Sequence, residues 1–205
     1  MTKASFHNWQ LEKRLFELSH IQRLAFAASC CERAFPNYVV FAQLARWGNP
    51  AVFRTSLNAA WDVIEGSRAV LVEHPTLEQQ CESLTPDLDD FSTPDIDVQA
   101  AAGQEAAFMI RLLLQFCEDS EPSYALRIAT FSRDTIDMYV QVLENLDPVD
   151  PQLNEKIAQH PLMLDELQRQ EADLRRLATL MASDEMKSFR ILVANPEKSN
   201  IGLCP

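Results

Sequence analysis

The placement of proline constrains the fold of this chain more than any other feature. Its 205 residues include 11 prolines but only 4 glycines, and the prolines fall between segments in which apolar residues recur every three or four positions. Proline interrupts helix hydrogen bonding, and apolar residues at this spacing form one face of a helix, so the pattern predicts helices separated by short turns. Val and Ile show no sustained alternation, which argues against an all-β fold. We therefore expect an all-α, single-domain, mostly antiparallel bundle of seven to nine helices.

Local capping signals predict several helix boundaries. Ser19 and Gln22 form a capping-box pattern that opens one helix, and Pro36 is expected to end it. Asn37 is then expected to cap a short helix that ends at Gly48. Further helices are predicted to begin at a Thr76 cap and at the prolines at positions 50, 94, 122, 151 and 161.

The last apolar-periodic segment, Leu162 to Ala194, contains no proline or glycine. A straight helix over it would span roughly 50 Å at the usual rise per residue, unless it breaks near Ser183. So long a helix in a small domain often pairs with its own copy, and we predict a homodimer. We expect residues 1–194 to form the bundle and residues 195–205 to form a tail docked on it. Asn200 would anchor the tail by hydrogen bonds, and Gly202 would allow close backbone approach.

The charge of the chain limits its partners. The formal net charge is −12, and no Lys or Arg occurs between Arg68 and Arg111. This acidic stretch disfavours nucleic acid and indicates either a solvated face or a surface for a basic protein partner. The longest uncharged run has 12 residues, whereas a membrane span needs roughly 18. With no export signal visible at the N-terminus, we expect a soluble cytoplasmic protein that makes no contact with membranes.

No cofactor is predicted. Five cysteines, two of them adjacent at Cys30 and Cys31, do not form a disulfide pattern. We expect buried reduced thiols, with a nucleophilic Cys30 or Cys31 as the alternative. A single Glu-x-x-His unit, Glu17 to His20, falls at a predicted helix break, so no metal site is expected. Glycine-rich phosphate loops are also absent from the sequence.

Two polar clusters interrupt the apolar pattern. In the first, Arg33 lies just before Pro36, where it would bind the free carbonyls of a helix C-terminus or, alternatively, a ligand. The second comprises Ser132, Asp134, Thr135 and Asp137. Its members either line a pocket or simply alternate with buried residues of the same helix, and we favour alternation.

The motifs Cys31-Glu32-Arg33-x-x-Pro36-Asn37-Tyr38-x-x-Phe41, Trp61-Asp62 and Ser199-Asn200-Ile201-Gly202 resemble those of the YjaG-like proteins. This bacterial family is grouped as a domain of unknown function, and the resemblance runs from about Trp9 to Leu203. It implies an all-helical bundle but no activity. It directs attention to six residues as ligand-binding or structural candidates: Glu32, Arg33, Asn37, Tyr38, Asn200 and Gly202. Catalytic residues stay unassigned.

These observations leave two hypotheses for function. The first is a non-catalytic cytoplasmic protein, homodimeric, that acts through an acidic helical surface on a protein partner. The alternative is an enzyme or a binder of a small anionic ligand, whose pocket lies where the tail meets Arg33. There the guanidinium would grip a carboxylate or phosphate, and Asn37 and Tyr38 would orient it.

Overall fold

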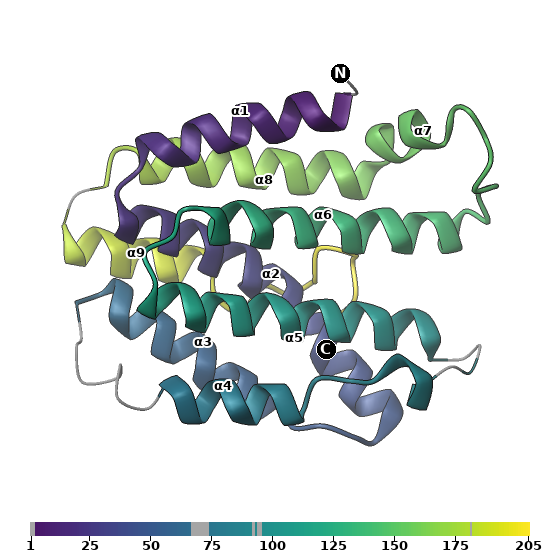
Figure 1. Cartoon of the computed structure of the whole chain (residues 1–205), viewed down its shortest axis with the longest axis horizontal. Coiled ribbons are helices and arrows are strands. Elements are labelled where there is room, and N and C mark those ends of the chain that lie inside the picture. The colour runs from purple at the N-terminus through teal and green to yellow at the C-terminus, as the bar shows by residue number, and fades with distance from the viewer. Residues whose placement is uncertain (1–2, 67–73, 92, 94–95, 181) are drawn as a thin grey trace.

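Helices account for all regular secondary structure in the residues that the computed structural model describes, which are 3–66, 74–91, 93, 96–180 and 182–205 (Figure 1). The elements are α1 Lys3–Glu17, α2 His20–Ala45, α3 Pro50–Ile64, α4 His74–Ser83, the 3-10 helix η2 Leu88–Phe91, α5 Asp97–Glu118, α6 Ser123–Leu143, α7 Leu153–Gln159, α8 Pro161–Leu177 and α9 Ser183–Val193. The predicted all-α, single-domain fold is confirmed. Within these ranges, no helix combines the length and apolarity that crossing a bilayer requires.

Several predicted boundaries follow their local signals. The Ser19 hydroxyl accepts from the Gln22 amide at 3.3 Å, and the Gln22 side chain accepts from the Ser19 amide at 2.7 Å, which completes the capping box. The Asn49 side chain caps α3, which begins at Pro50. The His160 side chain caps α8 in the same way. These starts depend on contacts within a few residues, so the sequence predicts them correctly.

Other starts differ from the prediction. Thr76 lies inside α4, which already begins at His74, and α7 begins at Leu153, two residues beyond Pro151. The predicted start at Pro94 lies outside the described residues, and α5 begins at Asp97 without a side-chain cap.

Pro36 does not end its helix, contrary to the prediction. α2 continues through it to Ala45, and Arg46 caps the end in the left-handed conformation at φ 51°. A proline inside a helix removes one hydrogen bond, at a cost of about 3 kcal/mol. α2 packs against α3, α5, α6, α8 and α9, and Pro36 itself is buried. The apolar contacts of this central helix offset the lost hydrogen bond.

The last segment follows the alternative with a break near Ser183, because its helix is interrupted between Leu177 and Ser183. The Gln22 amide on α2 donates to the carbonyls of Leu177 and Leu180, at 2.8 and 2.9 Å. A side chain from another helix thus satisfies carbonyls that end α8. The roughly 50 Å rod that motivated the homodimer prediction is not formed, although the dimer itself is not tested by this geometry.

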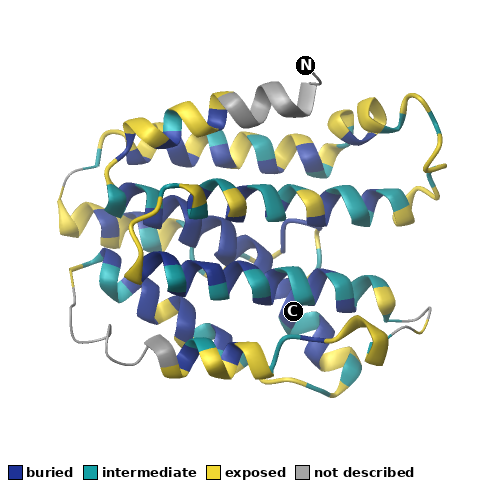
Figure 2. Ribbon diagram, viewed as in Figure 1, coloured by how far each residue is buried: buried dark blue, intermediate teal, exposed yellow. Residues whose placement is uncertain are grey.

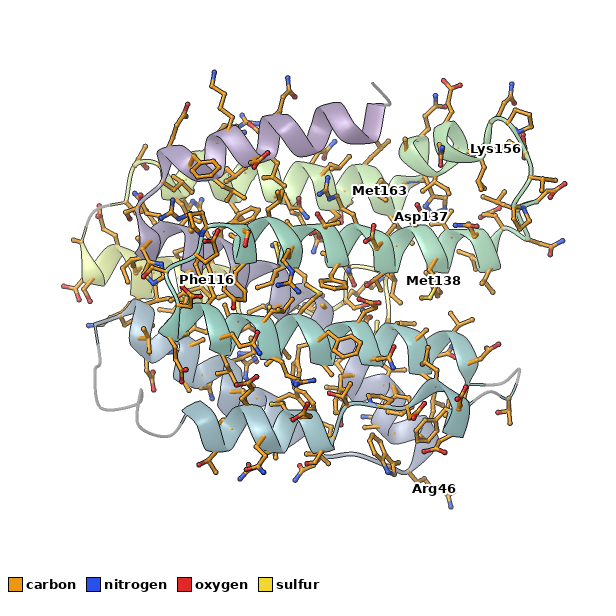
Figure 3. All side chains as sticks on the ribbon, in the orientation of Figure 1. Arg46, Phe116, Asp137, Met138, Lys156 and Met163 are labelled. Atoms are coloured by element: carbon orange, nitrogen blue, oxygen red, sulfur yellow. The ribbon has the colours of Figure 1, made fainter. Side chains whose placement is uncertain are left out.

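The core is centred on α2 and α5, which are largely buried, whereas α1 and α8 present exposed outer faces (Figure 2). A large apolar cluster joins the first six α-helices to α8 and α9. A smaller cluster contains Ile136, Ile157, Met163 and Ile201, with Met138 packed against it. In Figure 3, Met138 and Met163 mark this end of the bundle and Phe116 the opposite end. Ile201 thereby brings the C-terminal residues into contact with α6 and α8.

Candidate functional site

The six candidate residues do not form one site. Four of them lie on α2, where successive side chains point about 100° apart. Glu32 and Tyr38 contact other elements than Arg33 does, whereas Asn37 and Asn200 contact each other. The described geometry therefore separates Glu32 and Tyr38 from Arg33, whereas Asn200 contacts Arg33 through its backbone amide.

Arg33 lies within α2 and binds two carboxylates of α8 instead of helix-end carbonyls. Its Nε and Nη2 donate to the two oxygens of Glu166, at 2.8 and 3.1 Å. Its Nη1 donates to Asp173 at 2.8 Å. The predicted role at a helix C-terminus is wrong, because α2 continues past Pro36. A guanidinium occupied by two carboxylates of its own chain is not available to grip a ligand.

Further polar groups complete this buried network. Glu166 also accepts from Ser132 at 3.0 Å and from Gln170 at 2.8 Å, and Asp173 accepts from Ser29 at 2.7 Å. Burial raises the pKa of Glu166, but the Arg33 charge and these hydrogen bonds outweigh it, so the net pKa is lowered. The carboxylate therefore stays ionised inside the bundle.

Sequence reasoning missed Glu166, Gln170 and Asp173, although a signal was present. These polar residues occupy the same helical spacing as Met163, Leu174 and Leu177, which are buried. Polar residues within an inward-facing stripe require partners inside the protein. Of the second predicted cluster, Ser132 and Thr135 are buried and Asp134 is exposed.

Asn37 and Asn200 connect α2 and α6 to the C-terminal residues. The Asn37 amide donates to the Asn200 side chain at 2.9 Å, and the Asn200 backbone amide donates to the Arg33 carbonyl at 2.9 Å. The Asn200 amide group donates to the Ser132 carbonyl at 3.0 Å. Asn37 is therefore not a helix cap. Gly202 has φ +82°, and a Cβ added there would lie 3.9 Å from Leu162, so backbone conformation rather than close approach requires glycine.

Glu32 and Tyr38 belong to other contacts. The fully buried Glu32 carboxylate accepts from Arg54 at 2.8 and 2.6 Å and from the Trp61 indole at 2.9 Å. The Tyr38 hydroxyl donates to the Leu84 carbonyl at 2.7 Å. Burial raises the pKa of Tyr38 to about 12. Both residues connect α2 to neighbouring segments and lie outside the Arg33 network.

An open groove of about 700 Å³ lies next to this network and is lined by α1, α6 and α8. Figure 1 shows α1 and α8 as neighbouring helices. Its lining residues come from three helices: Gln10, Leu11, Lys13, Arg14 and Glu17 of α1, Arg133 of α6, and Leu164, Leu167, Gln168, Gln170, Glu171, Leu174 and Arg175 of α8. Four of these side chains are basic and two are acidic. The groove is thus a cationic site in a chain whose net charge is −12.

The groove cations differ in their surroundings. Arg14 and Arg175 both form ion pairs with Glu171, the latter at 2.9 Å. Arg133 is half-buried and donates to the Ala129 carbonyl at 3.2 Å and to the Thr130 hydroxyl at 3.1 Å. Burial lowers the pKa of Arg133, which means that its charge is less well solvated than that of an exposed arginine.

Comparison with known proteins gives the family. A family model described as "Protein of unknown function (DUF416)" matches residues 10–204. The chain belongs to the DUF416 family. The uncharacterized protein YjaG of Escherichia coli (strain K12) is 26% identical over 196 residues, covering 93% of this chain and 94% of the relative. YjaG of Salmonella typhimurium (strain LT2) is 25% identical with the same coverage.

A solved structure supports the same assignment. The crystal structure of a DUF416 family protein from Shewanella baltica OS155 has 25% sequence identity and a TM-score of 0.84, covering 95% of this chain and 98% of that chain. The resemblance inferred from the Glu-Arg-x-x-Pro-Asn-Tyr and Ser-Asn-Ile-Gly motifs is therefore confirmed, as is the helical fold that it implied.

In this DUF416 chain, the two adjacent buried cysteines are poor nucleophiles. Burial raises the pKa of Cys30 to about 12 and that of Cys31 well above its ordinary value. Both thiols are therefore protonated near neutral pH, whereas the thiolate is the reactive form. The groove, by contrast, exposes cations beside apolar side chains, an arrangement that attracts anions.

Proposed function

We propose that this DUF416 protein binds a small anionic ligand, without catalysis, in the groove formed by α1, α6 and α8. The cationic lining of a groove in a chain of net charge −12 carries the proposal. A concave surface with basic side chains concentrates anions locally even when the whole protein repels them.

The size and composition of the groove support this function. A volume of about 700 Å³ lies within the range of roughly 300–1,000 Å³ that is typical of small-molecule sites. The proposed site differs from the pocket predicted at the tail, because Arg33 is paired with Glu166 and Asp173. The proposed site depends instead on the basic side chains that line the groove, which are Lys13, Arg14, Arg133 and Arg175.

A thermal-shift assay with butanoate, succinate, citrate and inorganic phosphate at matched ionic strength tests the proposal. A ligand at 100 times its Kd stabilises the folded state by about 2.7 kcal/mol. We expect Arg133→Gln to lose most of this stabilisation. The exposed Arg127, also on α6 but outside the groove lining, provides the matched control Arg127→Gln. Equal stabilisation of wild type and Arg133→Gln by every anion would contradict the proposal, as would no stabilisation beyond that of sodium chloride.

The non-catalytic part of the proposal has its own test. A ligand that stabilises the protein should be recovered chemically unchanged after prolonged incubation, as measured by mass spectrometry. If the wild-type protein converts the ligand and Arg133→Gln does not, the groove is a catalytic site and the non-catalytic proposal is wrong.

A second candidate function is the binding of a basic protein partner in the cytoplasm. Asp87, Asp89 and Asp90 are exposed on and beside η2, which supports an acidic docking face. Replacing Asp87 and Asp90 with Asn should abolish co-purification of such a partner. Retention of the partner by this double variant would exclude this face.

The homodimer also remains a proposal. Ile191 and Leu192 of α9 are 81% and 59% exposed, and a second copy could cover them. Sedimentation analysis of wild type and Ile191→Glu tests this surface. A wild-type protein that is monomeric at all concentrations removes the dimer.

A further inference from the structure

We infer that the ligand of the groove is a carboxylate, held between Arg14 of α1 and Arg175 of α8 in the place that the carboxylate of Glu171 now occupies. Glu171 is then an internal competitor, which keeps the two arginines paired until a ligand displaces it. This inference rests on the proposed function, because it names the chemical class of the anion and the pair of side chains that holds it.

The carboxylate of Glu171 is bound from two helices. Its Oε2 atom forms an ion pair with Nη1 of Arg14 on α1, and its Oε1 atom accepts from Nε of Arg175 on α8 at 2.9 Å. All three side chains line the groove. Two guanidinium groups that donate to the two oxygens of one carboxylate match the planar shape of that group. The side chain of Glu171 thus shows which chemical group fits between these two arginines.

The guanidinium charges at this point exceed the carboxylate charge. Because Arg14 and Arg175 share Glu171, one of their two positive charges is uncompensated within this group. Lys13, a third basic side chain of the lining, is exposed. The Arg33 network has the reverse ratio, since two carboxylates there bind one guanidinium. An added anion is therefore attracted to the arginines of the groove and not to the buried network.

The ion pairs of Glu171 are weak enough for a ligand to displace them. The side chains of Arg14, Glu171 and Arg175 are 33%, 41% and 71% exposed. Ion pairs between side chains in contact with water shift an equilibrium by a factor of about five or less. Water already reaches each of these side chains, so the displaced Glu171 carboxylate can turn into solvent without leaving a buried charge unpaired.

Calorimetric titration of the full chain with succinate and with inorganic phosphate, at matched ionic strength, tests the inference. Glu171→Ala should tighten succinate binding by about fivefold, which is the factor by which an exposed ion pair competes. Glu17→Ala is the matched control, because it removes the other acidic side chain of the lining, whereas both arginines are paired with Glu171. This control should tighten succinate binding by about twofold or less, the effect of one solvated charge.

The arginines have a matched pair of variants of their own. Arg175→Gln should weaken succinate binding to the Glu171→Ala protein by about tenfold or more, because it removes a hydrogen bond between charged groups. Arg176→Gln, which replaces the exposed neighbour outside the groove lining, should change the affinity by about twofold or less. Succinate should bind Glu171→Ala more tightly than phosphate does, because its planar carboxylate replaces the one that was removed.

The outcomes separate this inference from the proposed function. Equal tightening in Glu171→Ala and Glu17→Ala overturns the inference and leaves an anion site in the groove, because only the total charge then matters. Succinate binding that is lost in Arg133→Gln but unchanged in Glu171→Ala has the same meaning. Phosphate that binds Glu171→Ala at least as tightly as succinate overturns the carboxylate class. Absence of binding by both anions, to wild type and to Glu171→Ala, overturns the inference and the proposed function together.

Discussion

Two arginines a short distance apart in the bundle have opposite surroundings. Arg33 is buried on α2 and bound by Glu166 and Asp173, whereas Arg133 on α6 lines an open groove. Gln170 contacts both regions, because it lines the groove and donates to Glu166. The comparison shows that the same residue type lies in a buried ion-pair network in one region and in the lining of an open groove in the other.

Removing Arg33 should produce the largest effect. Arg33→Leu leaves two carboxylates uncompensated in the interior, and breaking a buried ion pair in this way costs about 3–5 kcal/mol. The matched control is Arg169→Leu, which breaks an exposed pair with Asp165 on α8 and should cost about 0.5 kcal/mol or less. Urea denaturation measures the loss in free energy of unfolding for both variants. A loss below about 1 kcal/mol for Arg33→Leu would show that the buried network stabilises the fold no more than an exposed ion pair does.

Asn200→Ala should have the next largest effect. It removes the acceptor for the Asn37 amide and the donor to the Ser132 carbonyl. Leaving buried polar groups without partners costs about 1–3 kcal/mol. The exposed neighbour Lys198 gives the control Lys198→Ala. Proteolysis that cleaves both variants equally near the C-terminus would show that Asn200 does not hold this segment.

A third carboxylate, that of Glu105, extends the comparison, because its pKa is shifted in the opposite direction to that of Glu166. Burial, with a smaller contribution from Asp134, raises the pKa of Glu105 to about 7, in the opposite direction to Glu166. Between its ordinary pKa and about 7, the folded state keeps a proton that the unfolded state has lost, so stability falls as pH rises through this window. Glu105 is half-buried, and we therefore expect a contribution of only about 1 kcal/mol after screening.

Glu105→Gln should remove this pH dependence and stabilise the protein at pH 8 relative to wild type. Urea denaturation of wild type and variant at pH 5, 6, 7 and 8 measures the free energy of unfolding as a function of pH. Glu166 has the opposite sign, because its contribution is present at neutral pH and is lost on acidification below its ordinary pKa. A Glu105→Gln variant that keeps the wild-type slope between pH 5 and 7 would assign the pH dependence to other groups.

Arg133→Gln should have the smallest effect on stability. The residue is half-buried and its pKa is lowered by burial, so its charge adds little to the folded state and we expect a change within about 0.5 kcal/mol. The same substitution should nevertheless reduce anion binding. A large loss of stability would instead make Arg133 a structural residue like Arg33.

Much of the fold could be predicted, but the candidate site could not. Leucine spacing, the Ser19 capping box and the Asn49 and His160 caps act over a few residues, so they are readable in the sequence. The motif around Arg33 was correctly identified as belonging to a family. Its physical role was not, because Glu166 and Asp173 lie more than 130 positions away along the chain.

The sequence by itself determined that this chain is helical and where most helices begin, because hydrogen bonds within one helical turn set those features. Only the tertiary structure decided that α2 continues through Pro36 and that Gln22 ends α8. It also decided that Arg33 is neutralised while Arg133 lines a groove. Each of these depends on burial and on partners from distant segments, whose energies arise only when the helices pack together.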